Sequence, residues 1–174
     1  GMPDCLHWQA DGLLIRTEPC ACVPDKPAGD DLRQMYLWSR PVFRGAQYAR
    51  LWFRPRQPGG LAILITAASG MQGEDFLRDY PPRRCGSMKT IHSSDVRLYH
   101  WEFYREQPDV RNDLPSQAMI KWPYERTIGV GAYAGSLHEG WNLLEYRHEG
   151  GRIRGAINGQ LLIDGHDPGL AGKG

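Results

Sequence analysis

Near its C-terminal end the chain carries the alternating pattern of an antiparallel β-meander. The run from Trp141 to Asp164 (WNLLEYRHEGGRIRGAINGQLLID) holds three short segments of strand-forming residues. Gly150-Gly151 separates the first two segments, and Asn158-Gly159 separates the second from the third. An Asn-Gly pair favours a two-residue hairpin because both central residues of that turn need a positive φ. The run therefore predicts an antiparallel sandwich or barrel.

The first of these segments also predicts which side chains face a core. Successive strand residues point to opposite sides, so Leu144, Tyr146 and His148 share one side, and the charged residues between them share the other. We interpret His148 as an interior histidine whose hydrogen bonds are satisfied.

Composition limits the class of protein. The 174 residues are 41% hydrophobic and 24% charged, and the formal net charge is +1. We expect one domain over residues 1–174, and no nucleic-acid partner, since binding a phosphate backbone needs a concentrated basic face. No apolar run approaches the roughly 20 residues of a membrane span, so we expect no membrane partner.

Four cysteines are present, and they carry no familiar metal spacing. Cys20 and Cys22 are too close for an ordinary disulfide, which favours reduced thiols in a cytoplasmic protein. The alternative is a zinc site formed by Cys20, Cys22 and Cys85. The start of the chain lacks a secretion signal, and no nucleotide-binding loop is present. We therefore expect no metal and no cofactor.

The remaining sequence alternates strand patterns with turns. Further strands are predicted over residues 12–18, 35–38, 47–54, 61–68, 96–105, 117–122 and 127–132. The segment 61–68 (LAILITAA) is apolar on both sides, which predicts a central strand that is covered on both faces. Strand and helix patterns are absent between residues 69 and 95, and loops of this length are usually functional or mobile. We expect at most a short helical turn, near 74–79.

Candidate catalytic residues lie in the segment 96–105. On a strand, His100, Glu102 and Tyr104 project to one face, while Trp101 and Phe103 project to the other, which their bulk marks as the core side. An imidazole, a carboxylate and a phenol at intervals of about 7 Å span a sugar ring and are able to exchange protons with it. The alternative is that these three side chains only hydrogen-bond to one another on a solvated face.

Two carboxylates follow Gly70 and Gly73 in the long loop. One interpretation is that the loop folds over the sheet and brings Glu74 or Asp75 towards the His100 row. The other is that both residues cap a helical turn by accepting hydrogen bonds from its free amides.

The next predicted strand adds a cation and an aromatic ring. One interpretation places Lys121 on the face of His100, where it would suit a uronic acid. The alternative is an ordinary lysine that faces solvent. Trp122, before Pro123, is expected to be exposed. Three other tryptophans are expected in core positions: Trp52, Trp101 and Trp141.

The runs AASGMQGEDF (67–76) and IHSSDVRLYHWEFYR (91–105) resemble the YesU-like family, a domain family without an assigned activity. The matching positions are Gly70, Gly73, Glu74, Asp75, His92, Ser93, Asp95, His100 and Arg105. The closing meander resembles the broader concanavalin A-like lectin and glucanase group. The resemblance implies a jelly-roll β-sandwich of two curved antiparallel sheets with sugar bound on the concave face. Bacterial relatives are similar to proteins encoded near pectin-degradation enzymes, which implies plant-cell-wall oligosaccharides as ligands.

Three functions are consistent with these patterns. The first is an enzyme that acts on pectin-type oligosaccharides, either as a hydrolase that pairs Glu102 with a second carboxylate or as a lyase that uses His100 and Tyr104 as base and acid. The second is a non-catalytic carbohydrate-binding or accessory module, and the third is a purely structural sandwich. The residues expected to contact substrate are Glu74, Asp75, His92, Asp95, Arg105, Lys121 and Trp122.

The resemblance implies one strand before the first strand of this sequence and further strands after its last. This sequence has no counterpart of either. Either residues beyond those given supply them, or the chain forms a homodimer through the sheet edge that their absence exposes.

Overall fold

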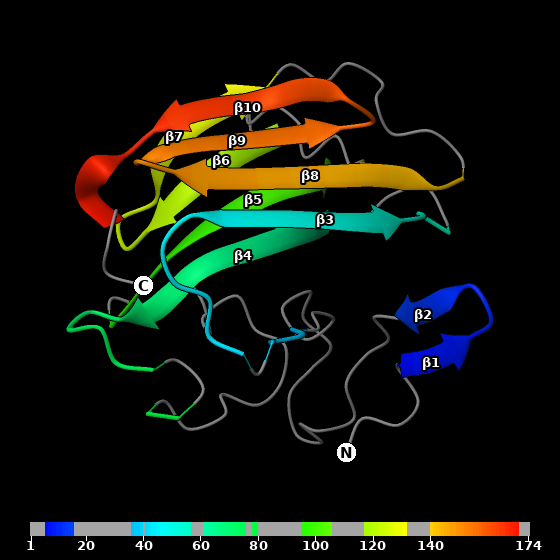
Figure 1. Cartoon of the computed structure of the whole chain (residues 1–174), viewed down its shortest axis with the longest axis horizontal. Coiled ribbons are helices and arrows are strands. Elements are labelled where there is room, and N and C mark those ends of the chain that lie inside the picture. Colours follow the sequence, from blue (N-terminus) through cyan, green and yellow to red (C-terminus); the bar gives the residue numbers. More distant parts are fainter. Residues whose placement is uncertain are drawn as a thin grey trace, which may run out of the picture.

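A computed structural model describes residues 6–15, 36–39, 41–56, 61–75, 78–79, 95–105, 117–131 and 140–170 of the chain. The described residues form an all-β structure (Figure 1). The strands are β1 (Leu6–Gln9), β2 (Gly12–Ile15), β3 (Gln47–Phe53), β4 (Leu61–Gly70), β5 (Val96–Arg105), β6 (Gln117–Trp122), β7 (Arg126–Gly131), β8 (Asn142–Glu149), β9 (Arg152–Ile157) and β10 (Gln160–His166). A short 3₁₀ turn, η4 (Pro168–Leu170), follows β10.

Two four-stranded antiparallel sheets make up the body of the structure. Sheet I has the order β10-β9-β8-β3, and sheet II has the order β4-β5-β6-β7. Figure 1 shows the strands of sheet I in front of those of sheet II. The strands β1 and β2 form a separate hairpin. This arrangement confirms the predicted class, a β-sandwich of two antiparallel sheets.

The main core lies between the two sheets. Buried members from sheet II are Tyr99, Trp101, Phe103 and Met119; those from sheet I are Leu144, Tyr146, Ile153, Ile157, Leu162 and Ile163. The hydroxyls of Thr66 and Tyr146 share a hydrogen bond of 2.8 Å across the gap between the sheets. The large rings therefore come from sheet II, and sheet I meets them mainly with aliphatic side chains.

The opposite face of sheet II is covered as well. Leu98, Ala118, Ile120 and Trp122 form a second buried cluster, against which Tyr36, Trp38, Ile65 and Ala68 pack. Most of β5 and β6 is therefore buried on both faces, although the sequence of β5 alternates between apolar and polar residues.

The C-terminal meander follows the prediction closely. Asn158 has a φ of 52° and Gly159 a φ of 79°, as the predicted hairpin requires. Gly150 and Gly151 likewise have positive φ values, 58° and 80°. The predicted bounds of β5 and β6 are also confirmed.

Two predictions about strands are wrong. Residues 36–39 form no regular strand, because their apolar side chains pack onto the second cluster without joining a ladder. The strand predicted to be central, β4, lies at the end of the described order of sheet II. It also runs further than predicted, since Ser69 pairs with Arg97 after a shift in register. The four cysteines and His92 lie outside the described residues.

Candidate functional site

The predicted catalytic row lies on the outer face of sheet II, away from sheet I. His100 and Glu102 occupy alternate positions of β5, and their Nε2 and Oε1 atoms lie 3.8 Å apart. His100 is 1% exposed and Glu102 is 6% exposed. The two residues thus form a buried imidazole–carboxylate pair, with the apolar residues of the second cluster on the same face.

Trp122 fixes the orientation of this histidine. Its indole Nε1–H donates a hydrogen bond of 3.3 Å to Nδ1 of His100, and the two rings meet at 62°. Because Nδ1 accepts here, the proton of a neutral imidazole sits on Nε2, the atom that lies towards Glu102. The indole therefore selects the tautomer of a neutral His100 whose N–H lies on the side of Glu102.

Trp122 is 9% exposed, so the prediction that it is the exposed tryptophan is wrong. Its side chain lies on the face of sheet II that Tyr36 and Trp38 cover, and the rings of those two residues stack with centroids 6.3 Å apart. The opposite error affects Trp52 and Trp141, which were expected in the core but are 61% and 40% exposed. Only Trp101 among these is buried as expected.

Lys121 does not share the face of His100, and that prediction is also wrong. The register of β5 and β6 pairs Tyr99 with Lys121 and His100 with Ile120, so Lys121 points towards sheet I. Its Nζ lies 2.5 Å from Oδ2 of Asp167. The cation is therefore held in an ion pair on the far side of the sheet.

Asp167 is the centre of a buried polar cluster that the sequence analysis did not identify. Besides Lys121, its carboxylate accepts hydrogen bonds from the Tyr99 hydroxyl (3.1 Å) and from the backbone N–H of Gly169 (2.9 Å). Burial alone would raise the pKa of Asp167, but these donors and the charge of Lys121 outweigh it and hold the pKa below its usual range. A lone Asp after a strand carries no sequence signal for such a role.

His148 lies beside this cluster. Its ring meets that of Tyr99 edge-on, with centroids 5.5 Å apart. The prediction of a buried histidine is confirmed, but its Nε2 finds no hydrogen-bond partner within the described part of the chain. Burial lowers the pKa of His148, and the charge of Asp167 offsets only part of that effect.

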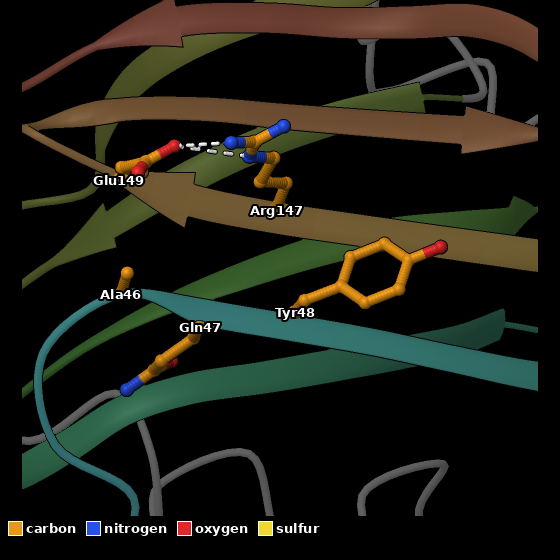
Figure 2. A pocket seen from close by; sticks show the side chains of 5 residues that line it. All are labelled: Ala46, Gln47, Tyr48, Arg147 and Glu149. Carbon is orange, nitrogen blue, oxygen red and sulfur yellow. Dashed lines mark hydrogen bonds and ion pairs between the residues drawn. The ribbon is translucent and has the colours of Figure 1, made fainter.

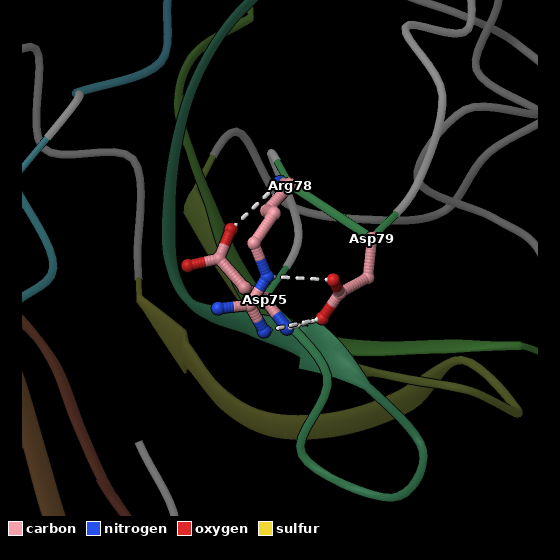
Figure 3. Close-up of polar contacts among 3 residues, drawn as sticks. All are labelled: Asp75, Arg78 and Asp79. Atoms are coloured by element: carbon pink, nitrogen blue, oxygen red, sulfur yellow. Dashed lines mark hydrogen bonds and ion pairs between the residues drawn. The ribbon is translucent and has the colours of Figure 1, made fainter.

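Asp75 follows the capping interpretation, whereas Glu74 accepts from an amide that precedes it. Oδ1 of Asp75 accepts from the backbone N–H of Arg78 at 2.8 Å, and Oδ2 of Asp79 accepts from the N–H of Asp75 at 2.9 Å (Figure 3). The backbone N–H of Gln72 donates to Oε2 of Glu74 at 2.8 Å. Both carboxylates thus hold the turn that follows β4.

The remaining predicted residues are placed only in part. Asp95 is exposed in the turn before β5. The backbone of Tyr104 and Arg105 is part of β5, but the structure does not describe their side chains. His92 lies outside the described residues. Within the described ranges, no group of three or more His, Cys, Asp or Glu side chains is arranged to hold a metal ion, and no helix is long and apolar enough to cross a membrane.

Comparisons with known proteins agree with this architecture. The chain is similar to "Uncharacterized protein YesU" of Bacillus subtilis (strain 168), with 27% identity over 77 residues, which are 44% of this chain and 35% of that protein. It also resembles a crystal structure described as a protein of unknown function with a galectin-like fold from Bacillus subtilis. The TM-score is 0.60 at 22% identity, over 72% of this chain and 58% of the other.

This chain therefore spans only part of the length of both proteins. The likeness to a galectin-like sandwich supports the predicted fold and says nothing of activity. A family model described as "Domain of unknown function (DUF1961)" matches residues 3–123, well over half of the sequence. The chain belongs to this DUF1961 family, and the resemblance to YesU-like proteins is confirmed.

Proposed function

We propose that the protein acts on plant-cell-wall oligosaccharides of the pectin type, with His100 and Glu102 as its acid–base pair. The observation that carries this proposal is the hydrogen bond from Trp122 to Nδ1 of His100, which turns the protonated nitrogen towards a carboxylate. The galectin-like sandwich supports a sugar as the ligand, since its sheet faces suit an extended chain.

Energetics support a functional role for the pair. Burying an imidazole and a carboxylate costs desolvation free energy, and a contact of 3.8 Å between Nε2 and Oε1 offsets only part of it. An apolar pair of the same size would serve the packing of sheet II at least as well. Strongly desolvated acid–base groups are enriched at sites of proton transfer.

Elimination is favoured over hydrolysis. A glycosidase needs two carboxylates beside the scissile bond. Of the possible partners of Glu102, Glu74 and Asp75 are engaged by the amides of their turn, and Asp95 is exposed in the turn before β5. In an elimination, one base takes the proton next to the uronate carboxylate, the carbon–oxygen bond to the leaving sugar breaks, and a carbon–carbon double bond forms. Because Nδ1 of His100 accepts from Trp122 and Nε2 carries the proton, the carboxylate of Glu102 would take the sugar proton with His100 beside it. Tyr104 would return one to the departing oxygen. His92, Asp95 and Arg105 remain proposed contacts for the sugar.

A non-catalytic binding module is the second candidate, and the burial of the pair favours it. His100 is 1% exposed, so a sugar reaches it only if residues on this face of sheet II, where Tyr36 and Trp38 pack on the second cluster, move. A protein that binds glycan elsewhere on its surface needs no such movement.

The test is incubation of the protein with oligogalacturonides while the ultraviolet absorbance of unsaturated products and the reducing ends are followed. We expect unsaturated products from the wild type and a loss of at least about a hundredfold in rate for His100→Gln and for Glu102→Gln. Glu125→Gln, at an exposed turn of the same sheet, should retain the wild-type rate. Urea unfolding of each variant separates lost activity from lost folding.

The outcomes distinguish the two candidates. Binding of the oligogalacturonide by calorimetry without any product supports the module. Neither binding nor product with a wide set of plant glycans would overturn both.

A further inference from the structure

The outer face of sheet I carries two exposed aromatic rings in one row. Tyr48 and Trp52 lie four residues apart on β3 and are 62% and 61% exposed. A strand advances about 3.4 Å per residue, so the two positions are about 14 Å apart on the same side. Tryptophan is seldom so exposed without a partner. A ligand that contacts both rings is longer than one sugar ring.

The phenol ring of Tyr48 is held in place by a neighbouring strand. Its hydroxyl donates a 2.9 Å hydrogen bond to Oε1 of Glu145 on β8, and Nε of Arg50 lies 3.3 Å from the same oxygen. The hydrogen bond also raises the pKa of Tyr48, so the phenol stays protonated and its face uncharged. A ring that is already oriented loses less entropy when a ligand packs on it.

A depression lies beside this ring. It has a volume of about 460 Å³ and is lined by Ala46, Gln47, Tyr48, Arg147 and Glu149. Figure 2 shows Tyr48 and Arg147 on neighbouring strands, with the guanidinium of Arg147 turned towards Glu149. The depression thus combines the ring of Tyr48 with a planar hydrogen-bond donor, Arg147, and an acceptor, Glu149. A sugar matches this set, because it has a C–H face that packs on a ring and hydroxyl groups at its edges.

The four arginines of this face are each paired with a carboxylate of the same face, and two of them share one carboxylate. Arg50 pairs with Glu145, Arg147 with Glu149, and Arg152 and Arg154 with Asp164. A uronate would have to displace one of these carboxylates from its guanidinium. A neutral sugar would use only the remaining N–H groups and oxygen lone pairs.

We infer that the outer face of sheet I is a binding surface for a neutral oligosaccharide, with Tyr48 as its principal contact and Trp52 as a second one further along β3. The inference shares a sugar ligand with the proposed function, but it involves the opposite sheet and needs no movement of the cover over His100.

The experiment titrates the protein with neutral xylo-, galacto- and cello-oligosaccharides and, as the acidic counterpart, oligogalacturonides, by calorimetry and tryptophan fluorescence. Tyr48→Ala and Trp52→Ala should each weaken binding of a neutral oligosaccharide on the order of tenfold, as loss of an aromatic contact typically does. Trp8→Ala is the matched control, since Trp8 is an exposed tryptophan of the separate N-terminal hairpin. Tyr48→Phe keeps the ring and loses the hydrogen bond to Glu145, so its affinity should fall between wild type and Tyr48→Ala.

Three results would overturn the inference: no saturable binding of any neutral oligosaccharide, binding that Tyr48→Ala and Trp52→Ala leave unchanged, or an equal loss in Trp8→Ala. His100→Gln separates the two proposals. Binding that depends on Tyr48 and persists in His100→Gln supports the sheet I surface even if no product forms. Product formation that persists in Tyr48→Ala supports the His100 site even if this surface binds nothing.

Discussion

The indole of Trp101 fills the space in which Gly155 would carry a side chain. A Cβ atom at Gly155 would lie 2.7 Å from Cη2 of Trp101, and two further ring atoms would lie within 2.9 Å. Trp101 is fully buried between the sheets and has no room to withdraw. The separation of sheets I and II at this point therefore depends on a residue without a side chain.

Gly155→Ala should lower the free energy of unfolding by about 2–3 kcal/mol, because overpacking a closed core forces rings and backbone to shift. Urea unfolding monitored by fluorescence measures it. Gly129→Ala is the control: its Cβ would meet one methyl group of Ile163 at 3.2 Å, so its cost should be clearly smaller.

A double variant tests the cause. Trp101→Phe removes the indole atoms that block position 155, so Gly155→Ala should cost at least about 1 kcal/mol less in that background than in the wild type. Simple additivity of the two changes would show that the indole is not the obstacle.

Asn158→Ala should destabilise the hairpin between β9 and β10 by about 2 kcal/mol. The variant loses the acceptor of the Leu143 N–H (2.9 Å) and the donor to Oδ1 of Asn142 (2.8 Å), and it places alanine at a φ of 52°. Thermal unfolding checks the size of the effect.

Two further substitutions at this position separate the contributions. Asn158→Gly relieves the backbone, so it should cost less than Asn158→Ala. Asn158→Asp keeps only the acceptor for Leu143. Equal losses in all three variants would show that only the donor to Asn142 matters.

Asp167→Asn should lower stability at neutral pH by about 2 kcal/mol, because it removes a charge that Lys121 and Tyr99 both contact. The folded pKa of Asp167 lies below its unfolded value of about 3.9, so its contribution is complete above that pH. It is lost as the pH falls through the folded pKa.

Unfolding free energies measured from neutral to acidic pH should therefore fall less steeply below about pH 4 in Asp167→Asn than in the wild type. Asp164→Asn, in an exposed pair with Arg152, is the control and should change stability much less. An identical acid response of wild type and Asp167→Asn would contradict this account.

His148 should make the protein less stable as the pH falls from about 7 to about 5. Burial lowers the folded pKa of His148 below the unfolded value of 6.5, so the unfolded chain takes up the proton more readily. The contribution of His148 is complete above pH 6.5 and declines as the pH falls from there through the folded pKa. His148→Gln should flatten the pH dependence of the urea midpoint in this window.

Local sequence was sufficient for the C-terminal meander and its turns. Alternation and the Asn158-Gly159 pair predicted the meander, and they grouped Leu144, Tyr146 and His148 on one buried side. These features depend on neighbours a few residues apart, which the sequence displays directly.

Prediction failed where the outcome depended on distant segments. Alternation in β3 shows that Trp52 shares a side with Tyr48, but only the packing of sheet I decides that this side faces solvent. Trp122 is buried because Tyr36 and Trp38, far away in the chain, pack over its face. The face of Lys121 follows from its register with Tyr99, which no local pattern specifies.

Both faces of β5 are covered by other side chains, and this limits which substitutions the strand tolerates. At β3, substitutions at every second position face water, so random mutagenesis should find permissive and intolerant sites in alternation. At β5, Tyr99 and Trp101 pack towards sheet I while Leu98 and His100 pack beneath the opposite cover, so adjacent positions are all restrictive. A deep mutational scan should therefore find every position from 98 to 103 sensitive to substitution.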